Sequence, residues 1–286
     1  MRKSAGVCVG LFVLLSGGAA LAQASAPDMG PPPVLVIQRE FVKPGKSGMV
    51  HEKSESAFVA AMRAAKWPTP YLAMTSMSGR SRALFMLGYG SFADWEKDNK
   101  AIEKNAALSA TLDKLGVIDG DLLTEFNQSV FTYDAEYSLR AHDVVHDRYF
   151  EISQIHIKPG HRAEWIELMK IYKDGFGKAS TPLANWAVYE SYYGEDNGGL
   201  YLEISAMKTL AEDDQTMGDG KKFSDAIGAD GMKKVRELAA ACVESSQTNL
   251  FEFSPKMSYA SDEWIKADPF WKPKAPAAAK PAAPAQ

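Results

Sequence analysis

Apolar strands and amphipathic helices alternate along this chain in an order that occurs twice. Each set begins with an apolar strand that ends at a Pro-Gly pair, because proline cannot donate to a strand ladder, and a helix follows. The first set predicts strands at 34–43, 70–78, 83–90 and 129–134, with helical segments after the first strand and over 91–116. The second set predicts strands at 149–158, 184–193, 200–205 and 249–254, with helical segments after the first strand and over 206–245.

The helix that follows each Pro-Gly pair shows an apolar face. Residues at helical spacing that share a face are expected to turn toward the core. In the second set these residues are Trp165, Leu168, Met169, Tyr172 and Phe176. In the first set the pattern is weaker and consists of Val50, Ala57, Phe58, Ala61 and Ala65.

The two sets are also similar in sequence. Residues 34–46 match 149–161 at an offset of 115, and both segments contain Lys-Pro-Gly after an apolar strand. The same offset relates 91–98 to 206–213, and 130–133 matches 250–253 at an offset of 120. Three matches in one order indicate an internal repeat.

The order strand-helix-strand-strand-helix-strand is that of the ferredoxin-like unit. The fold class is therefore expected to be α+β, with tandem ferredoxin-like repeats (βαββαβ). Two such sheets would bury their apolar faces against each other, so that one chain forms an intramolecular barrel. The predicted organisation is a signal peptide at 1–24, a Pro-rich spacer at 25–33, repeats at 34–137 and 149–262 joined by a linker at 138–148, and a Pro/Ala/Lys-rich disordered tail at 263–286.

The strand that leads into Ile157–Gly160, followed by Ala163–Trp165, resembles the NIPSNAP-like branch of the dimeric α+β barrel superfamily. That superfamily also contains proteins similar to antibiotic-biosynthesis monooxygenases, EthD-like proteins and haem-handling enzymes. The resemblance covers both copies and implies the fold. It transfers no catalytic residue, because the shared motif marks a junction between a strand and a helix and carries no chemistry.

The amino-terminal segment of the chain indicates export. Arg2 and Lys3 precede an apolar run over 7–15, and Ala22–Ala24 supplies a small-x-small cleavage pattern. The run is too short to span a bilayer, so we expect a periplasmic or secreted protein with no stable membrane anchor after cleavage. Removal of the leader would leave 30 basic and 36 acidic residues, and Cys242 as the only cysteine. Cys242 lies in an apolar helical stretch and is expected to be a buried core thiol.

Composition and the absence of known motifs exclude several classes of function. The 286 residues carry a formal charge of −4, which argues against a nucleic-acid partner. The sequence contains no phosphate-binding Gly-rich loop, nucleophile elbow or paired-cysteine motif, and it predicts no cofactor. The expected partner is a small apolar or aromatic molecule, and the chain is expected to be a monomer or a homodimer.

The first strand of each set carries polar residues among apolar ones. Arg39 shares a strand face with Ile37, and the equivalent face of the second set contains Gln154 and His156. His156 is a candidate for catalysis because an imidazole can act as acid, base or ligand near neutral pH. The alternative is a hydrogen-bonded structural histidine. Arg39 and Gln154 are candidates for ligand binding.

Two further catalytic candidates, Glu190 and Glu203, lie on the central strands of the second set. Aromatic neighbours would raise the pKa of such a carboxyl group and would make it a proton acceptor. The alternative is a cross-strand polar contact at the sheet surface. The aromatic candidates for ligand binding are Trp186, Tyr189 and Tyr201.

Only His142 and His146 have a spacing typical of metal ligands, since residues four apart share a helix face. They fall in the predicted linker, where a polar connection without a metal is the simpler interpretation. Three hypotheses therefore stand. The protein binds a small molecule, or it is a cofactor-independent oxygenase or isomerase of an aromatic or quinone-like substrate, or it binds haem through a histidine.

Overall fold

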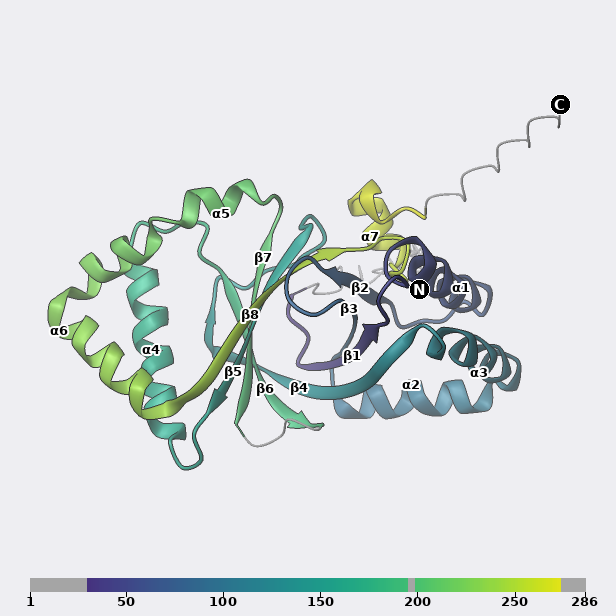
Figure 1. Ribbon diagram of the computed structural model, residues 1–286, viewed down its shortest axis with the longest axis horizontal. Coiled ribbons are helices and arrows are strands. Elements are labelled where there is room, and N and C mark those ends of the chain that lie inside the picture. Colours follow the sequence, from purple (N-terminus) through teal and green to yellow (C-terminus); the bar gives the residue numbers. More distant parts are fainter. Residues whose placement is uncertain (1–29, 195–198, 274–286) are drawn as a thin grey trace, which may run out of the picture.

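Eight strands form a closed barrel at the centre of the molecule (Figure 1). The computed structural model describes residues 30–194 and 199–273. Around the barrel the strand order is β1-β3-β2-β8-β5-β7-β6-β4, and all neighbouring strands are antiparallel. The strands are β1 (Val34–Val42), β2 (Tyr71–Ser76), β3 (Arg82–Tyr89), β4 (Leu123–Leu139), β5 (Tyr149–Ile157), β6 (Trp186–Tyr193), β7 (Leu200–Met207) and β8 (Val243–Phe253).

Each half of the chain contributes one four-stranded part of this barrel. The first half has the order β4-β1-β3-β2, and the second half has the same order of equivalent strands, β8-β5-β7-β6. Two contacts join the halves, β2 with β8 and β4 with β6. Closure leaves no sheet edge without a neighbouring strand in the barrel.

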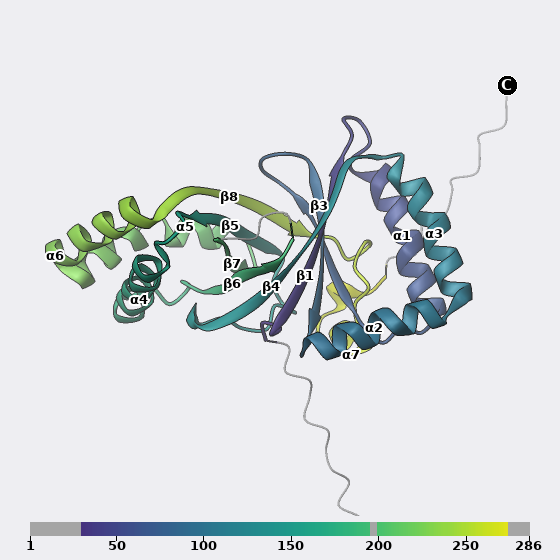
Figure 2. The same cartoon turned by 90° about the horizontal axis from the view of Figure 1, so that it is seen from below.

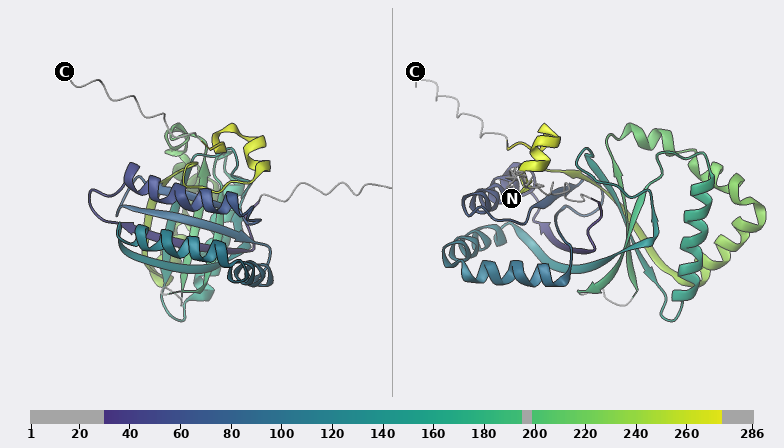
Figure 3. Two further views of the ribbon diagram at one scale, coloured as in Figure 1. Left: turned by 90° about the vertical axis from the view of Figure 1, so that its right-hand side faces the viewer. Right: turned by 180° about the vertical axis from the view of Figure 1, so that it is seen from behind.

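Helices cover the outer faces at two opposite sides of the barrel (Figures 1 and 2). One side carries α1 (Met49–Ala64), α2 (Phe92–Lys104) and α3 (Ala106–Gly120), and Figure 3 shows α1 and α3 lying across the strands. The other side carries α4 (Arg162–Lys178), α5 (Ala211–Thr216) and α6 (Asp219–Cys242). The short helix α7 (Asp262–Ala267) lies beside the barrel and is followed by a 3-10 turn at Pro269–Trp271.

Strand alternation separates the interior of the barrel from the layers under the helices. Leu35 and Ile37 of β1 belong to the cluster that fills the barrel, together with Phe150 and Ile152 of β5. Val34, Val36 and other alternate residues of β1 face the helices instead. A large second cluster joins α4 and α6 to the outer face of β5–β7.

Six strands follow the expected ranges closely, but the last strand of each half is longer than expected. β8 begins at Val243, whereas the sequence pattern predicts a strand only at 249–254. β4 begins at Leu123 and ends at Leu139, whereas the sequence pattern predicts a strand only at 129–134. The added residues pair with β1 at one end and with β6 at the other. Polar residues occupy many of these positions, so the pattern of apolar residues alone does not reveal them.

Two other expectations need correction. The face predicted for the first helix is wrong, because Val50 is exposed and the buried residues of α1 are His51, Glu55 and Val59. The start of the predicted tail, 263–286, is also too early, because residues up to Pro273 are folded. Trp271 is fully buried against the barrel, which holds this segment in place. Residues 274–286 lie outside the described residues, as do 1–29 with the predicted signal peptide and most of the spacer.

The linker at 138–148 is shorter than expected, since β4 occupies its first two residues and Val145 is buried in the barrel cluster. Cys242 is buried and has a free thiol, as predicted. Within the described residues, no helix has both the length and the apolar composition needed to cross a membrane.

Candidate functional site

A cavity of about 550 Å³ lies between the outer face of the second half-barrel and the helices α4 and α6. Its floor consists of residues that alternate along β5 and β7, including Ser153, Ile155, Glu203 and Ser205. These positions face the helices because their neighbours, such as Ile204, point into the barrel. The floor of the cavity is therefore partly polar. Its cover is apolar along α4 and carries Glu212, Asp213 and Asp219 where α5 and α6 meet.

Glu203 is the residue of this cavity that is best suited to act as an acid or a base. On the sheet it pairs with Ser153 of β5 on one side and Val188 of β6 on the other. No described residue donates a hydrogen bond to its carboxylate. Burial raises the pKa of Glu203 to about 7, and the nearby carboxylate of Glu151 contributes to the rise.

Aromatic rings line the cavity above this carboxyl group. Phe223 of α6 stacks on Tyr172 and Phe176 of α4, with ring centroids 5.3 and 4.7 Å apart. Phe176 in turn meets Trp186 of β6 edge to face at 5.5 Å. Gly175 makes this arrangement possible, because a side chain there would collide with the ring of Phe223. The walls therefore offer flat apolar surfaces close to a carboxyl group that titrates near neutral pH.

This combination suits a flat aromatic ligand with an acidic proton. Aromatic rings bind another ring by stacking and by edge-to-face contact. A carboxylate whose pKa is near the working pH is an effective general base, because it is available in ionised form and still binds a proton strongly. The cavity is large enough for a ligand of this kind, since small-molecule sites generally occupy about 300–1,000 Å³.

Glu190, the second predicted carboxylate, lies on the same sheet face but is already paired. Its oxygens accept hydrogen bonds from Arg162, at 2.6 Å from Nη2 and 3.4 Å from Nε. Tyr201 lies against the same pair, and its ring contacts Trp165 at 5.0 Å. Glu190 and Tyr201 do not line the cavity, whereas Trp186 does.

The remaining strand candidates lie on the barrel-facing side of the sheets. Gln154 and His156 of β5 are partly buried there, on the side opposite to the cavity. Arg39 is buried and donates hydrogen bonds from Nη1 to Ser129 at 2.9 Å and Asn127 at 3.2 Å. Arg39 and His156 therefore do not share a cavity with Glu203.

A second, mostly apolar cavity of about 460 Å³ opens at one end of the barrel, beside α7. Tyr189, another predicted ligand-binding residue, lines it together with Leu35, Met86 and Phe150. Burial raises the pKa of Tyr189 well above its usual range, so its hydroxyl stays protonated. This cavity contains no carboxylate comparable with Glu203 among the residues of its sheet walls.

His142 and His146 do not form a joint ligand pair. The segment that contains them is irregular rather than helical, so the four-residue spacing does not bring them to one face. His142 Nε2 lies 3.2 Å from Asp147, which raises the pKa of His142, and His146 Nδ1 lies 3.3 Å from Asp268. Each imidazole thus has its own carboxylate partner.

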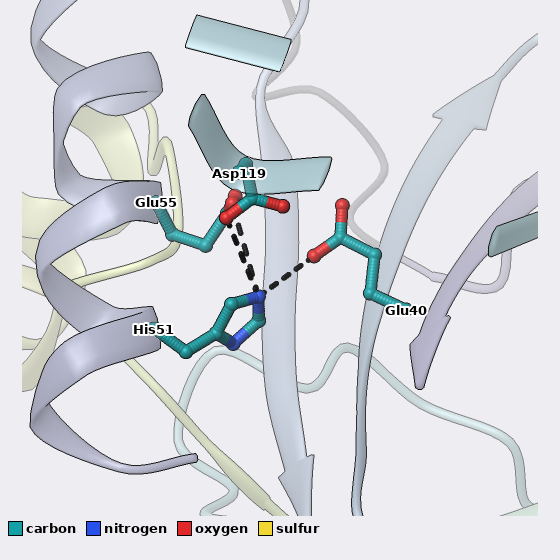
Figure 4. A group of neighbouring side chains, drawn as sticks. All are labelled: Glu40, His51, Glu55 and Asp119. Carbon is teal, nitrogen blue, oxygen red and sulfur yellow. Dashed lines mark hydrogen bonds and ion pairs between the residues drawn. The ribbon is translucent and has the colours of Figure 1, made fainter. Parts of the chain in front are cut away.

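The sequence interpretation missed one buried polar cluster, which lies under the helices of the first half (Figure 4). His51 and Glu55 of α1 meet Glu40 of β1 and Asp119 of α3. The available signal was the four-residue spacing of His51 and Glu55, which places both on one helix face. The assignment of a buried helix face from apolar residues does not use this spacing, because the buried face of α1 carries His51 and Glu55.

Comparison with known proteins supports the fold and does not establish a function. No family model matches the chain, and no curated protein matches it. A structure from Fusobacterium nucleatum, described only as a candidate monooxygenase, has a TM-score of 0.51 and 13% identity over 78% of this chain and 93% of its own. An anthrone oxidase-like protein has a TM-score of 0.50 and 14% identity over 79% and 93%.

A mutant chlorite dismutase from Candidatus Nitrospira defluvii aligns with a TM-score of 0.48 and 12% identity, over 84% of this chain and 97% of its own. At these identities the likeness concerns architecture alone. The architecture is that of a dimeric α+β barrel, and here a single chain supplies both sheets.

Proposed function

We propose that this protein binds a small aromatic molecule in the cavity between β5–β7 and α4–α6, and acts on it with Glu203 as the proton acceptor. One observation carries the proposal: a carboxyl group with a pKa near 7 and no hydrogen-bond partner among the described residues lies on the floor of an aromatic cavity. The ligand class is a flat, weakly acidic compound such as a phenol, a hydroxyquinone or an anthrone.

In this scheme the bound ring lies against Tyr172, Phe176 and Trp186, and its acidic O–H or activated C–H faces Glu203. Glu203 takes the proton and becomes neutral, which the low-dielectric surroundings favour. The electron pair of the broken bond stays on the substrate as a delocalised anion. The rings of Tyr172, Phe176 and Trp186 lie beside this anion.

Two reactions can follow, and they differ in the need for oxygen. In an isomerase, the proton returns from Glu203 to another atom of the same substrate. In a cofactor-independent oxygenase, the anion gives electrons to O₂, and a CH₂ group plus O₂ becomes a carbonyl group plus water. The names of the two structures with TM-scores of 0.50 and 0.51 favour the oxygenase as the first reaction to test.

Haem binding through a histidine finds no support at this cavity. No histidine is among the residues that line it, and His156 faces the other side of β5. His142 lines the second cavity, but both of its ring nitrogens already have partners, in Asp147 and the carbonyl of Arg140.

The direct experiment is a binding titration of the purified protein with hydroxynaphthalenes, hydroxyquinones and anthrone, followed by tryptophan fluorescence. Trp165 and Trp186 line the cavity, so an aromatic ligand should quench their emission. An oxygen electrode then separates oxygenase from isomerase turnover for each ligand that binds. Absence of quenching by every compound, together with no change in unfolding temperature, would refute the proposal.

The control must separate the role of Glu203 from a general effect of charge. Glu203→Gln keeps the shape of the side chain and removes the proton acceptor, so turnover should fall by about 10²-fold or more. Glu252→Gln makes the same change on an exposed part of β8 and should leave turnover unaltered. Equal losses in the two variants would contradict a role as general base.

We also propose export and descent from a duplicated unit. Export is supported by the charge, apolar run and cleavage pattern of residues 1–24, and the amino-terminal sequence of protein secreted from the native host tests it. Duplication of one ferredoxin-like unit of NIPSNAP-like type is supported by the matched Lys-Pro-Gly segments and by the equal strand order of the halves. A sedimentation experiment decides between a monomer and a homodimer.

A further inference from the structure

A compact group of ionisable side chains is buried in the first half, away from the proposed substrate cavity. It contains Glu40 of β1, His51 and Glu55 of α1, and Asp119 of α3 (Figure 4). One ligand-type atom from each residue lies within 4.8 Å of all the others. The side chains of His51, Glu55 and Asp119 are only 3%, 5% and 4% exposed.

The hydrogen bonds within the group are incomplete. His51 Nε2 lies 2.9 Å from Glu40 Oε2, which is a normal hydrogen bond. The same nitrogen lies 3.9 Å from Glu55 Oε1 and 3.8 Å from Asp119 Oδ1, and these distances are too long for hydrogen bonds. Glu55 Oε1 and Asp119 Oδ1 are buried without any hydrogen-bond partner. Both unpartnered oxygens point into the group, toward the imidazole nitrogen (Figure 4).

The charge of the group is also unbalanced. Three carboxyl groups face one imidazole, and within the described residues no lysine or arginine forms an ion pair with any of them. Asp119 adds a further electrostatic cost, because it lies in the last turn of α3, where the helix dipole disfavours negative charge. Buried charges of this kind are normally paired or bound to a metal.

The spacing of the four atoms suits a small cation. Ligand atoms about 2.1 Å from an ion lie about 3.0 Å apart at right angles and about 3.4 Å apart at tetrahedral angles. The separation of 2.9 Å between His51 and Glu40 already fits. The separations of 3.8 and 3.9 Å would need contractions of only a few tenths of an ångström to about 1 Å.

We propose that Glu40, His51, Glu55 and Asp119 bind one divalent transition-metal cation that joins β1, α1 and α3. One imidazole nitrogen and three carboxylate oxygens form a donor set that suits Zn²⁺ or Mn²⁺ and their neighbours in the first transition row. Mg²⁺ and Ca²⁺ favour oxygen donors and water, so the imidazole argues against them. The two unpartnered oxygens acquire a partner when the ion binds.

The test uses the full-length protein after treatment with a chelator and dialysis. Isothermal titration with ZnCl₂ and with MnCl₂ should show one site per chain. The unfolding temperature should rise by about 5 °C or more when the metal is present at 100 times its dissociation constant. Titration with CoCl₂ should give a visible absorption band with the intensity of a protein-bound ion.

Conservative variants locate the ion. Glu55→Gln and Asp119→Asn preserve shape and should weaken binding by more than about 100-fold each, beyond the roughly 10- to 100-fold effect of an outer-shell change. Without metal, both variants should be about as stable as the wild type, because each amide replaces a carboxyl group that has an oxygen without a hydrogen-bond partner. Glu52→Gln is the matched control, because Glu52 lies on the same helix and pairs with Lys256 outside the group. Its metal affinity should equal that of the wild type.

The proposal is overturned if Zn²⁺, Mn²⁺ and Co²⁺ all fail to bind the wild type, since Glu55 and Asp119 then share a proton instead. It is also overturned if binding is unchanged in both Glu55→Gln and Asp119→Asn, or if only Mg²⁺ or Ca²⁺ binds. These outcomes are independent of whether the other half of the molecule binds an aromatic ligand.

Discussion

Glu203 of β7 lies directly opposite Ser153 of β5, on the sheet face that α4 and α6 cover. The Ser153 hydroxyl lies 2.7 Å from the Thr248 hydroxyl on the next strand and forms no hydrogen bond with the Glu203 carboxylate. The carboxyl group remains available to a ligand.

Ligand binding should depend on pH through Glu203. The pKa of this group is about 7, so its ionised fraction rises through neutral pH. The affinity for a phenolic ligand should therefore increase with pH across this range, as long as the ligand itself stays protonated. Fluorescence titrations at pH values on both sides of 7 measure the effect. The increase should be absent in Glu203→Gln, and an unchanged pH profile in that variant would assign the dependence to another group.

Glu203 should also make the folded protein less stable at high pH. Its pKa is raised in the folded state, so folding favours the protonated form, and this contribution declines as pH rises from about 4.5 to about 7. Relative to the wild type, Glu203→Gln should gain about 1–3 kcal/mol above pH 7. Urea denaturation of both proteins at pH 5 and at pH 8 measures the difference. A gain of equal size at the two pH values would contradict the assigned cause.

Two glycines of α4 should respond in opposite ways to alanine. In Gly175→Ala the new methyl group would meet Phe223 and Ile227, and we expect a loss of about 1–3 kcal/mol together with weaker ligand binding. In Gly177→Ala the methyl group meets nothing within 4 Å, so the higher helix propensity should stabilise the protein by up to about 1 kcal/mol. Urea denaturation tests both, and similar effects of the two variants would argue against close packing of α4 on α6.

The segment after α7 should be essential for the stability of the barrel. Trp271 is fully buried, donates a hydrogen bond from Nε1 to the carbonyl of Val145 at 2.7 Å, and packs against Phe253. Trp271→Ala should cost about 3–5 kcal/mol. Phe126→Ala, which removes a half-exposed ring on β4, should change stability by less than about 0.5 kcal/mol. Equal unfolding midpoints for Trp271→Ala and the wild type would show that the segment is not docked.

Sequence periodicity was sufficient to predict the order of strands and helices. The Lys-Pro-Gly segments mark equivalent strand ends, and the aromatic face of α4 was identified from its spacing. The periodicity did not reveal the folded segment at 263–273, because its packing depends on a few aromatic residues rather than on a repeated pattern. Trp271 contacts Val145 across 126 positions, and no local signal encodes such a contact.

The sequence predicted some of the candidate functional residues and missed others. Glu203 and Trp186 were candidates because they lie among aromatic residues on central strands, and both line the cavity. The cluster around His51 was missed because the helix was oriented by its apolar residues, and Val50 suggested the wrong face. The buried face of a helix is normally assigned on the rule that apolar residues face the core and charged residues face solvent, and α1 does not follow that rule.

The two sheets of this barrel belong to one chain, and this has a consequence for how the molecule can change. At the offset of 115, Glu40 of β1 corresponds to Ile155 of β5, so the charged cluster and the aromatic cavity occupy equivalent places in the two halves. In an assembly of two identical chains, a substitution at such a place alters both sides at once. Here each side can be altered alone, so that one molecule can hold two different chemistries under the same architecture.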